Sequence, residues 1–396
     1  MFGRQSLTKP NYGPRPSHPV GMVPPGESTG GRHAPRQDPS RPDSRPELAA
    51  IPRLVPALRY LITGGAGFIG SHIVDALVAD GHRVVILDDF STGRLANVEQ
   101  LVINGSADLV EGSVTDATLV DDLMGDCDCC LHLASAVGVK LVVARPLETL
   151  RRIVEGTDVV ISAASRHDKR VLFASTSEVY GKSSSDVALH EDSDRVLGSA
   201  FKSRWSYAIA KSYGEAIAHG YHREHGADTM VVRLFNTIGP RQRDTYGMVV
   251  PRFVRRAILG DDVTVYGDGS QSRCFLHVRD AVAAILALSM HDGATGRAFN
   301  IGNPEPITIL ELAERVIARV ESSSRISFVP YAEAYEEGFE ELGKRRPDTT
   351  ALHDLLGWRP TCTLDDALDD VIDYQRAELA LGAGELGSRK TPARAT

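Results

Sequence analysis

Short apolar segments alternate with helical segments from Leu58 onward, and this alternation restricts the fold more than any other feature. RYLIT is followed by a helical stretch from Phe68 to Asp80, then by RVVILD, a turn, DLVEG, a helix and CCLHLA, and RVLFAS and MVVRLF continue the pattern. Strands that are apolar throughout are typical of parallel sheets, because helices bury both faces of the sheet. The sequence therefore predicts an α/β fold built on a doubly wound parallel sheet.

The alternation loosens after about Asn236, where prolines punctuate a smaller α/β region that we expect to bind substrate. At the other end, residues 1–57 contain 12 of the 21 prolines, many arginines and almost no apolar clusters. Such a segment cannot bury enough surface to offset its ordering entropy, so we expect disorder, with a solvated tail favoured over one that contacts an acidic partner. The predicted organisation is an extension over 1–57, a cofactor domain over 58–235 completed by elements from 274–302, a substrate domain over 236–384 and a flexible tail over 385–396.

Composition is ordinary for a soluble enzyme. The 396 residues are 42% hydrophobic and 24% charged, with a net charge of -8, which gives no reason to expect a nucleic-acid or membrane surface. No apolar run approaches the roughly 20 residues of a membrane span, and the N-terminus lacks the apolar core of a signal peptide. We therefore expect a cytoplasmic protein.

The five cysteines do not suggest a disulfide framework, because Cys127, Cys129 and Cys130 crowd into DCDCCLHLA while Cys274 and Cys362 stand alone. A reducing compartment fits this distribution. CDCC also resembles part of a metal-ligand cluster, but it lacks a second ligand pair and continues into an apolar strand. A buried strand without metal is the favoured interpretation.

A glycine-rich turn joins the first apolar segment to the helix that follows it. In LITGGAGFIGSH, Gly64, Gly67 and Gly70 stand at the end of the strand and the opening of the helix. Glycine there permits a tight turn and close approach of the backbone to a pyrophosphate, while the helix N-terminus supplies amide donors. The alternative is a purely structural glycine-rich turn; the spacing favours a dinucleotide site.

The segment RVVILD ends in Asp88, at the distance downstream where a carboxylate accepts both hydroxyls of an adenosine ribose. A carboxylate repels a 2′-phosphate, so NAD is favoured over NADP. Asp89 is the neighbouring candidate, and the sequence leaves open which of the two faces the ribose; a helix-capping role for Asp88 is the alternative.

WSYAIAK places Tyr207 and Lys211 four residues apart on one helix face. An ammonium about 4 Å from a phenol lowers the phenol pKa from about 10 by about two units at intermediate dielectric, which makes a tyrosine usable as a base. This spacing also occurs by chance on exposed helices. The upstream dinucleotide turn and the cluster Ser175, Thr176 and Ser177 at the end of RVLFAS favour the catalytic interpretation.

GGAGFIG, STSEVYG, YAIAK and RLFNTIGPR, in this order and spacing, resemble the extended short-chain dehydrogenase/reductases of the NAD-dependent epimerase/dehydratase family, which act on nucleotide sugars. The resemblance covers nearly all of residues 58–380. It implies a Rossmann domain with bound NAD, a smaller C-terminal domain for a nucleotide sugar, and a homodimer built from paired long helices. The predicted cofactor-binding residues are Gly64, Gly67, Phe68, Ile69, Gly70, Asp88, Asp89, Thr92, Gly93, Ser113, Val114, Leu133, Ala134, Ser135, Tyr207 and Lys211.

Three stretches resemble the UDP-glucuronate decarboxylases within that family: Glu178 in STSEVYG, Arg273 followed by Cys274, and KRRPD, which contains Arg345. A solvated basic turn is the alternative for KRRPD. Other stretches depart from the family pattern: Ser113 replaces a usual aspartate, Ile153 replaces a usual asparagine, and HLASAVGVKLVV lacks the prolines of the decarboxylases.

The resemblance implies oxidation at the sugar C4, which turns the acid into a β-keto acid that can lose carbon dioxide. Tyr207 takes the hydroxyl proton, Thr176 holds the C4 oxygen, and Lys211 holds the phenolate and the nicotinamide ribose. Arg273 is expected to pair with the substrate carboxylate and Glu178 to position water or the ring. The predicted substrate-binding residues are Asn236, Val250, Tyr266, Gln271, Arg273 and Arg345.

The expected product is UDP-xylose, and escape of the intermediate would release a 4-keto pentose. One alternative is a UDP-hexose or UDP-glucuronate 4-epimerase, which needs Thr176, Tyr207 and Lys211 but has no special need for Glu178 or Arg273. A second alternative is a non-catalytic NAD-binding regulator, against which the intact Thr, Tyr and Lys set argues. The arginines of PRFVRRAI are expected to form a solvated helix face, and Tyr266 to stack on uracil or pack as a core aromatic.

Overall fold

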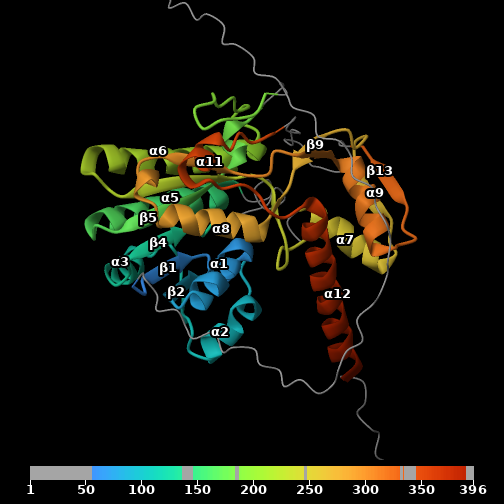
Figure 1. The fold of residues 1–396 in the computed structure, drawn as a ribbon, viewed down its shortest axis with the longest axis horizontal. Coiled ribbons are helices and arrows are strands. Elements are labelled where there is room, and N and C mark those ends of the chain that lie inside the picture. The colour runs from blue at the N-terminus through green and yellow to red at the C-terminus, as the bar shows by residue number, and fades with distance from the viewer. Residues whose placement is uncertain are drawn as a thin grey trace, which may run out of the picture. The chain divides into compact units, whose positions relative to one another are not determined.

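The computed structural model describes residues 56–135, 146–182, 187–244, 248–330, 333 and 345–388 (Figure 1). The predicted extension therefore lies outside the described residues except for its last two positions. So do residues 136–143 of the HLASAVGVKLVV stretch, residue 344 of KRRPD, and residues 389–396 of the predicted tail.

A seven-stranded sheet forms the centre of the fold, in the order β11-β6-β5-β4-β1-β2-β3, and all its pairings are parallel. This confirms the predicted doubly wound sheet. The strands, whose central positions are mostly buried, are β1 (Arg59–Thr63), β2 (Arg83–Asp88), β3 (Asp108–Glu111), β4 (Cys129–His132), β5 (Arg170–Thr176), β6 (Thr229–Leu234) and β11 (Ala298–Ile301). Because β11 pairs with β6, the chain returns to this sheet after the first substrate-domain elements.

Helices cover both faces of the sheet (Figure 1). α1 (Phe68–Ala79) and α8 (Val278–Ser289) share one apolar core with β1 and β6, and α2 (Glu99–Ile103) and α11 (Thr350–Leu356) pack against the same core. On the opposite face, α3 (Ala117–Gly125), α5 (Pro146–Arg166) and α6 (Ser206–His225) pack against the sheet.

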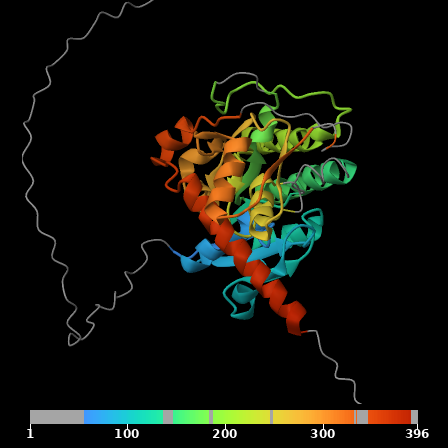
Figure 2. The ribbon, with the colours of Figure 1, turned by 90° about the vertical axis from the view of Figure 1, so that its right-hand side faces the viewer.

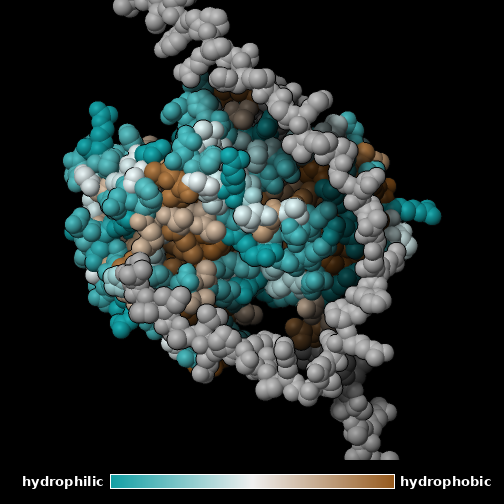
Figure 3. Space-filling model, viewed as in Figure 1, coloured by the Kyte–Doolittle hydropathy of each residue, from teal (hydrophilic) through white to brown (hydrophobic). Residues whose placement is uncertain are grey.

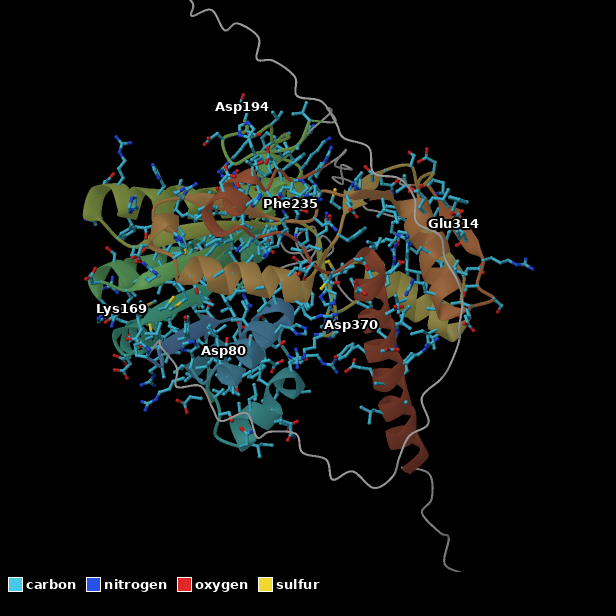
Figure 4. The ribbon with its side chains drawn as sticks, in the orientation of Figure 1. Asp80, Lys169, Asp194, Phe235, Glu314 and Asp370 are labelled. Atoms are coloured by element: carbon cyan, nitrogen blue, oxygen red, sulfur yellow. The ribbon has the colours of Figure 1, made fainter. Side chains whose placement is uncertain are left out.

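A second, smaller core lies beyond the carboxyl ends of the strands. It joins α7 (Val249–Leu259), α9 (Ile309–Val320) and α12 (Leu364–Ser388) with the pair β8 (Val263–Tyr266) and β13 (Ile326–Val329). Two further pairs connect the regions: β7 (Thr237–Ile238) with β10 (Leu276–His277), and β9 (Ser272–Cys274) with β12 (Pro306–Thr308). In Figure 4, Phe235 is labelled where β6 leaves the sheet toward this region, and its side chain is fully buried.

The long helix α12 contacts both regions (Figure 2). Asp370 near its start accepts a hydrogen bond of 3.0 Å from His277, and Glu378 forms an ion pair of 3.1 Å with Arg94 in the turn after β2. The helix continues to Ser388 and so includes the first positions of the predicted tail.

The cysteine cluster belongs to the buried strand β4 and the residues before it. Cys127, Cys129 and Cys130 are free and buried, and burial raises the pKa of Cys127 to about 11. Among the described residues, no group of three or more His, Cys, Asp or Glu side chains is placed to hold a metal ion. None of the described helices is long and apolar enough to cross a membrane, and the face in Figure 3 is mostly hydrophilic.

Candidate active site

A cavity of about 490 Å³ lies at the carboxyl ends of the sheet strands and is also lined by side chains of the second region. This is where open α/β sheets bind their ligands. The structure brings most of the predicted site residues to its wall. These are Gly64, Gly67, Phe68, Ile69, Gly70, Asp88, Asp89, Thr92, Ser113, Val114, Leu133, Ala134, Ser135, Thr176, Glu178, Tyr207, Lys211, Asn236, Tyr266, Gln271, Arg273 and Arg345.

Two predicted residues do not line the cavity. Val250 is fully buried in the core of the second region, and its neighbour Val249 lines the cavity instead. Successive residues of a helix point about 100° apart, so a one-residue difference in α7 exchanges a core position for a cavity position. Gly93 lies behind Asp88: a Cβ atom on Gly93 would come within 2.8 Å of an Asp88 carboxylate oxygen.

The glycine turn after β1 has the geometry that a pyrophosphate needs. Gly64 has a φ of +73°, and a Cβ atom there would lie 2.8 Å from the amide nitrogen of Ala134 on the turn after β4. A Cβ atom on Gly70, in the first turn of α1, would overlap the carbonyl oxygen of Gly64. Only glycine leaves this backbone accessible at the helix N-terminus, and the turn lines the cavity, so these residues fit a dinucleotide.

Asp88 and Asp89 have different surroundings at the end of β2. The Asp88 carboxylate is 7% exposed and accepts hydrogen bonds of 2.9 Å from the backbone amides of Ala66 and Phe90. Burial raises the pKa of this carboxyl, although both amides oppose the rise. Asp89 instead forms an ion pair of 3.1 Å with Arg152 on α5. Only the Asp88 carboxylate is therefore fixed against the glycine turn.

Tyr207 lies at the start of α6, and its phenol faces the hydroxyl groups of Ser135 and Thr176. Burial and the nearby charge of Glu178 raise the pKa of this phenol, and the two hydroxyl groups oppose the rise. The predicted lowering of the phenol pKa by Lys211 is therefore wrong for the protein groups alone. Burial of the phenol, which disfavours the phenolate, is the larger effect.

Lys211 is almost fully buried and lines the cavity. Its Nζ atom donates a hydrogen bond of 2.7 Å to the carbonyl oxygen of Ala174 and lies 4.7 Å from the centre of the Phe173 ring. Burial lowers the pKa of Lys211 to about 7, and the charge of Glu215, one turn further along α6, opposes this change. Burial therefore favours the neutral amine of Lys211, which limits its effect on the phenol.

Glu178 forms a buried ion pair that the sequence did not indicate. Its two carboxylate oxygens accept hydrogen bonds of 2.6 and 3.1 Å from Arg204, and Arg345 lies 3.8 Å away. Burial alone would raise the pKa of Glu178, but Arg204 and Arg345 hold it below its usual value. Arg204 precedes Tyr207 by three residues, and this spacing on the approach to α6 is the one sequence signal that connects it with the site.

The second region contributes aromatic and basic side chains. The guanidinium of Arg252 lies 4.3 Å from the centre of the Tyr266 ring, and Gln271 donates a hydrogen bond of 3.2 Å to the Tyr266 carbonyl oxygen. Arg252 also lines the cavity, so the prediction of a solvated arginine face on α7 is wrong for this residue, whereas Arg255 is exposed. Asn236 donates a hydrogen bond of 3.0 Å to the Cys274 carbonyl oxygen.

Residues 60–302 match the model of the NAD dependent epimerase/dehydratase family. A UDP-N-acetyl-alpha-D-glucosaminuronate decarboxylase of Bacillus cytotoxicus is 41% identical over 80% of this chain and 98% of its own length. UDP-glucuronic acid decarboxylase 1 of Danio rerio is 37% identical over 81% of this chain and 73% of its own length.

Solved structures with the same fold include two epimerases. The UDP-glucose 4-epimerase of Thermotoga maritima, with UDP-glucose, is 29% identical, with a TM-score of 0.73 over 81% of this chain and 100% of the other. The UDP-glucuronic acid 4-epimerase of Bacillus cereus, in complex with UDP-glucuronic acid and NAD, is 27% identical with the same TM-score and coverage.

Proposed function

The chain belongs to the NAD-dependent epimerase/dehydratase family, and we propose that within this family it decarboxylates UDP-glucuronate to UDP-xylose. The observation that carries this proposal is the cluster of Arg204, Arg273 and Arg345 around Glu178 beside Tyr207. Three guanidinium groups and one carboxylate leave positive charge at the cavity wall, which suits a substrate with an acid on its sugar as well as a diphosphate. The names of both relatives support decarboxylation, and the name of the Danio rerio relative supports UDP-glucuronate as the substrate.

The first step is oxidation of the sugar at C4. When bound, NAD accepts and later returns the hydride of C4 and brings the positive charge of its nicotinamide to the phenol. Gly64, Gly67 and Gly70 hold the pyrophosphate, and Asp88 holds the adenosine ribose. Tyr207 takes the C4 hydroxyl proton, and Thr176 holds the C4 oxygen, while Lys211 binds the nicotinamide ribose.

Decarboxylation follows because the C4 ketone is β to the acid. The electrons of the C5–C6 bond move into the C4 carbonyl, carbon dioxide leaves, and a proton adds at C5. Arg273 pairs with the substrate carboxylate and then with the developing enolate, while Tyr266 and Arg345 contact the nucleotide. Some 4-keto pentose leaves the site when the hydride is not returned in time.

One other substrate and one other reaction remain candidates on specific observations. The name of the 41% identical relative favours the 2-acetamido analogue of UDP-glucuronate, which carries the same acid at C5. The epimerase structures share the fold and support a 4-epimerase, in which the keto sugar rotates before the hydride returns.

We also propose that the protein acts in the cytoplasm as a homodimer and has no nucleic-acid or membrane partner. The buried free cysteines support a reducing compartment. Residues 58–235, completed by elements from 274–302, would bind NAD, and 236–384 the nucleotide sugar. Light scattering after gel filtration tests the dimer, and a monomer at micromolar concentration would contradict it.

The deciding experiment incubates the full chain and catalytic NAD with UDP-glucuronate, its 2-acetamido analogue and UDP-glucose, and follows the products by mass. We expect UDP-glucuronate to lose the mass of carbon dioxide. Tyr207→Phe should abolish the reaction, and Glu178→Gln or Arg273→Ala should slow carbon dioxide release strongly while NAD still binds. Inversion at C4 with no loss of mass would establish the epimerase, and turnover of the acetamido sugar alone would establish the second substrate. Full activity of Tyr207→Phe would contradict the assigned mechanism.

A further inference from the structure

We infer that Arg204 is a positioning residue of this reaction, which holds the Glu178 carboxylate ionised and in one orientation at the cavity wall beside Tyr207. The inference rests on the proposed decarboxylation. It concerns a residue that contacts Glu178 and acts through it.

The two side chains come from segments that flank the cavity. Glu178 lies in the 3₁₀ turn Ser177–Tyr180 directly after β5, and Arg204 lies in the 3₁₀ turn Ser203–Trp205 directly before α6. The two terminal guanidinium nitrogens of Arg204, Nη1 and Nη2, donate to Glu178, one to each carboxylate oxygen. A bidentate pair of this kind fixes the plane of the carboxylate as well as its position.

The pair is shielded from solvent, with 6% of the Arg204 side chain and 17% of the Glu178 side chain exposed. Burying two charges carries a desolvation cost, and apolar residues of similar volume are often equally stable in such places. Both residues line the cavity, and Glu178 follows Thr176 by two residues. Stability is therefore a weak explanation for the pair, and its place beside the reacting groups favours a role in the reaction.

Arg204 is the closest of the cations around Glu178. Arg345 is 3.8 Å from one carboxylate oxygen, and it also donates a hydrogen bond of 3.4 Å to Ser177. Removal of Arg204 would leave the Glu178 carboxyl in a buried site where desolvation favours its neutral form. The carboxyl of Glu178 would then take up a proton more readily and be free to rotate, with only Arg345 and Arg273 left to favour its charged form.

The test compares Arg204→Met and Arg204→Lys with the unaltered full chain, with NAD and UDP-glucuronate, over a range of pH. For Arg204→Met we expect kcat for carbon dioxide release to fall about 100-fold at neutral pH, because a small displacement of an active-site group commonly has an effect of this size. The affinity for NAD should not change. The rate of this variant should recover as pH rises and Glu178 loses its proton. Arg204→Lys keeps a positive charge but cannot donate to both carboxylate oxygens in the same way, so it should lose less activity than Arg204→Met. If the methionine variant does not fold, the loss of activity and the pH profile of the lysine variant serve as the test.

A double variant separates action through Glu178 from an independent effect. If Arg204 acts through Glu178, Glu178→Gln combined with Arg204→Met should be no slower than Glu178→Gln alone. Arg170→Met is the matched control, because Arg170 binds Asp228 at 2.6 Å at the opposite end of β5 and does not line the cavity. It should lower stability and keep kcat.

Three results would overturn the inference: an unchanged kcat in Arg204→Met at every pH, a double variant slowed by the product of the single effects, or the same loss of activity in Arg170→Met. Failure of the proposed function looks different, because the unaltered chain would then release no carbon dioxide from UDP-glucuronate in the same assay.

Discussion

The Nζ atom of Lys211 donates a hydrogen bond of 2.7 Å to the carbonyl oxygen of Ala174, inside the protein. Only 2% of Lys211 is exposed, and burial lowers its pKa from 10.5 to about 7. The folded chain therefore binds fewer protons than the unfolded chain between about pH 7 and 10.5. The buried Lys211 therefore lowers the free energy of unfolding at neutral pH, and this destabilisation decreases as the pH rises through that window.

Lys211→Met should therefore stabilise the protein at pH 7 by about 2–4 kcal/mol, because a group with a strongly shifted pKa no longer has to be buried. Denaturant unfolding without added NAD measures this difference, which should shrink between pH 7 and 10. The variant should at the same time lose activity. Lys169→Met, at a partly exposed lysine just before β5 that does not line the cavity, is the control and should change stability by less than about 1 kcal/mol. A variant less stable than the parent at pH 7 would contradict the prediction.

A second prediction concerns Glu215, which is 6% exposed and accepts hydrogen bonds from Arg195, from Ser175 at 2.5 Å and from Arg233 at 2.7 Å. Glu215→Gln leaves the buried Arg233 without a full countercharge, so stability should fall by about 3–5 kcal/mol. Because the charge of Glu215 raises the pKa of Lys211, this pKa should fall further, and the pH dependence of kcat should shift toward acid.

The control for Glu215 is Glu224→Gln, which changes an exposed glutamate on the same helix. It should leave both the unfolding midpoint and the pH profile in place. An acid shift in this variant as well would show that a general change in charge, rather than the contact with the network, determines the profile.

The sheet could be predicted because its strands are apolar throughout and are separated by helices of suitable length, a pattern that has few solutions in three dimensions. The family and the NAD cofactor are confirmed as well, since short motifs at fixed spacing specify a backbone shape that holds a pyrophosphate. The roles of the individual site residues stay predictions.

Other features of the site depend on tertiary contacts that the sequence does not display. Arg204 and Glu178 are 26 residues apart, and nothing local to either shows that they meet. The sequence could not show which of Val249 and Val250 faces the cavity, because the rotation of α7 about its own axis is set by packing against the rest of the protein. The pKa of Tyr207 was predicted from Lys211 alone, and the extent of burial reversed its direction.

A third prediction resolves the choice between the two acids after β2. Asp88 is held by two backbone amides beside the glycine turn, whereas Asp89 pairs with Arg152. Asp88→Asn should weaken NAD binding about 10- to 100-fold, the usual effect of losing hydrogen bonds to a charged group, and should reduce discrimination against NADP. Asp89→Asn should change NAD affinity by less than about 3-fold, because Asp89 is not expected to accept the hydrogen bonds of the ribose. Calorimetric titration with both dinucleotides measures this, and equal losses in the two variants would contradict the assignment.

The last prediction compares two glycines in helices. A Cβ atom on Gly70 would overlap the Gly64 carbonyl oxygen, so the turn and α1 have to separate, whereas a Cβ atom on Gly220 in α6 would meet no atom within 4 Å. Gly70→Ala should therefore lose most NAD affinity and about 2 kcal/mol or more of stability, as overpacked sites do. Gly220→Ala should keep its NAD affinity and gain about 0.5–1 kcal/mol, because alanine restricts the unfolded chain and favours helix. Thermal unfolding with and without NAD measures both effects. If Gly70→Ala binds NAD as tightly as Gly220→Ala, the close contact between Gly70 and the Gly64 carbonyl oxygen does not exclude a side chain from this turn.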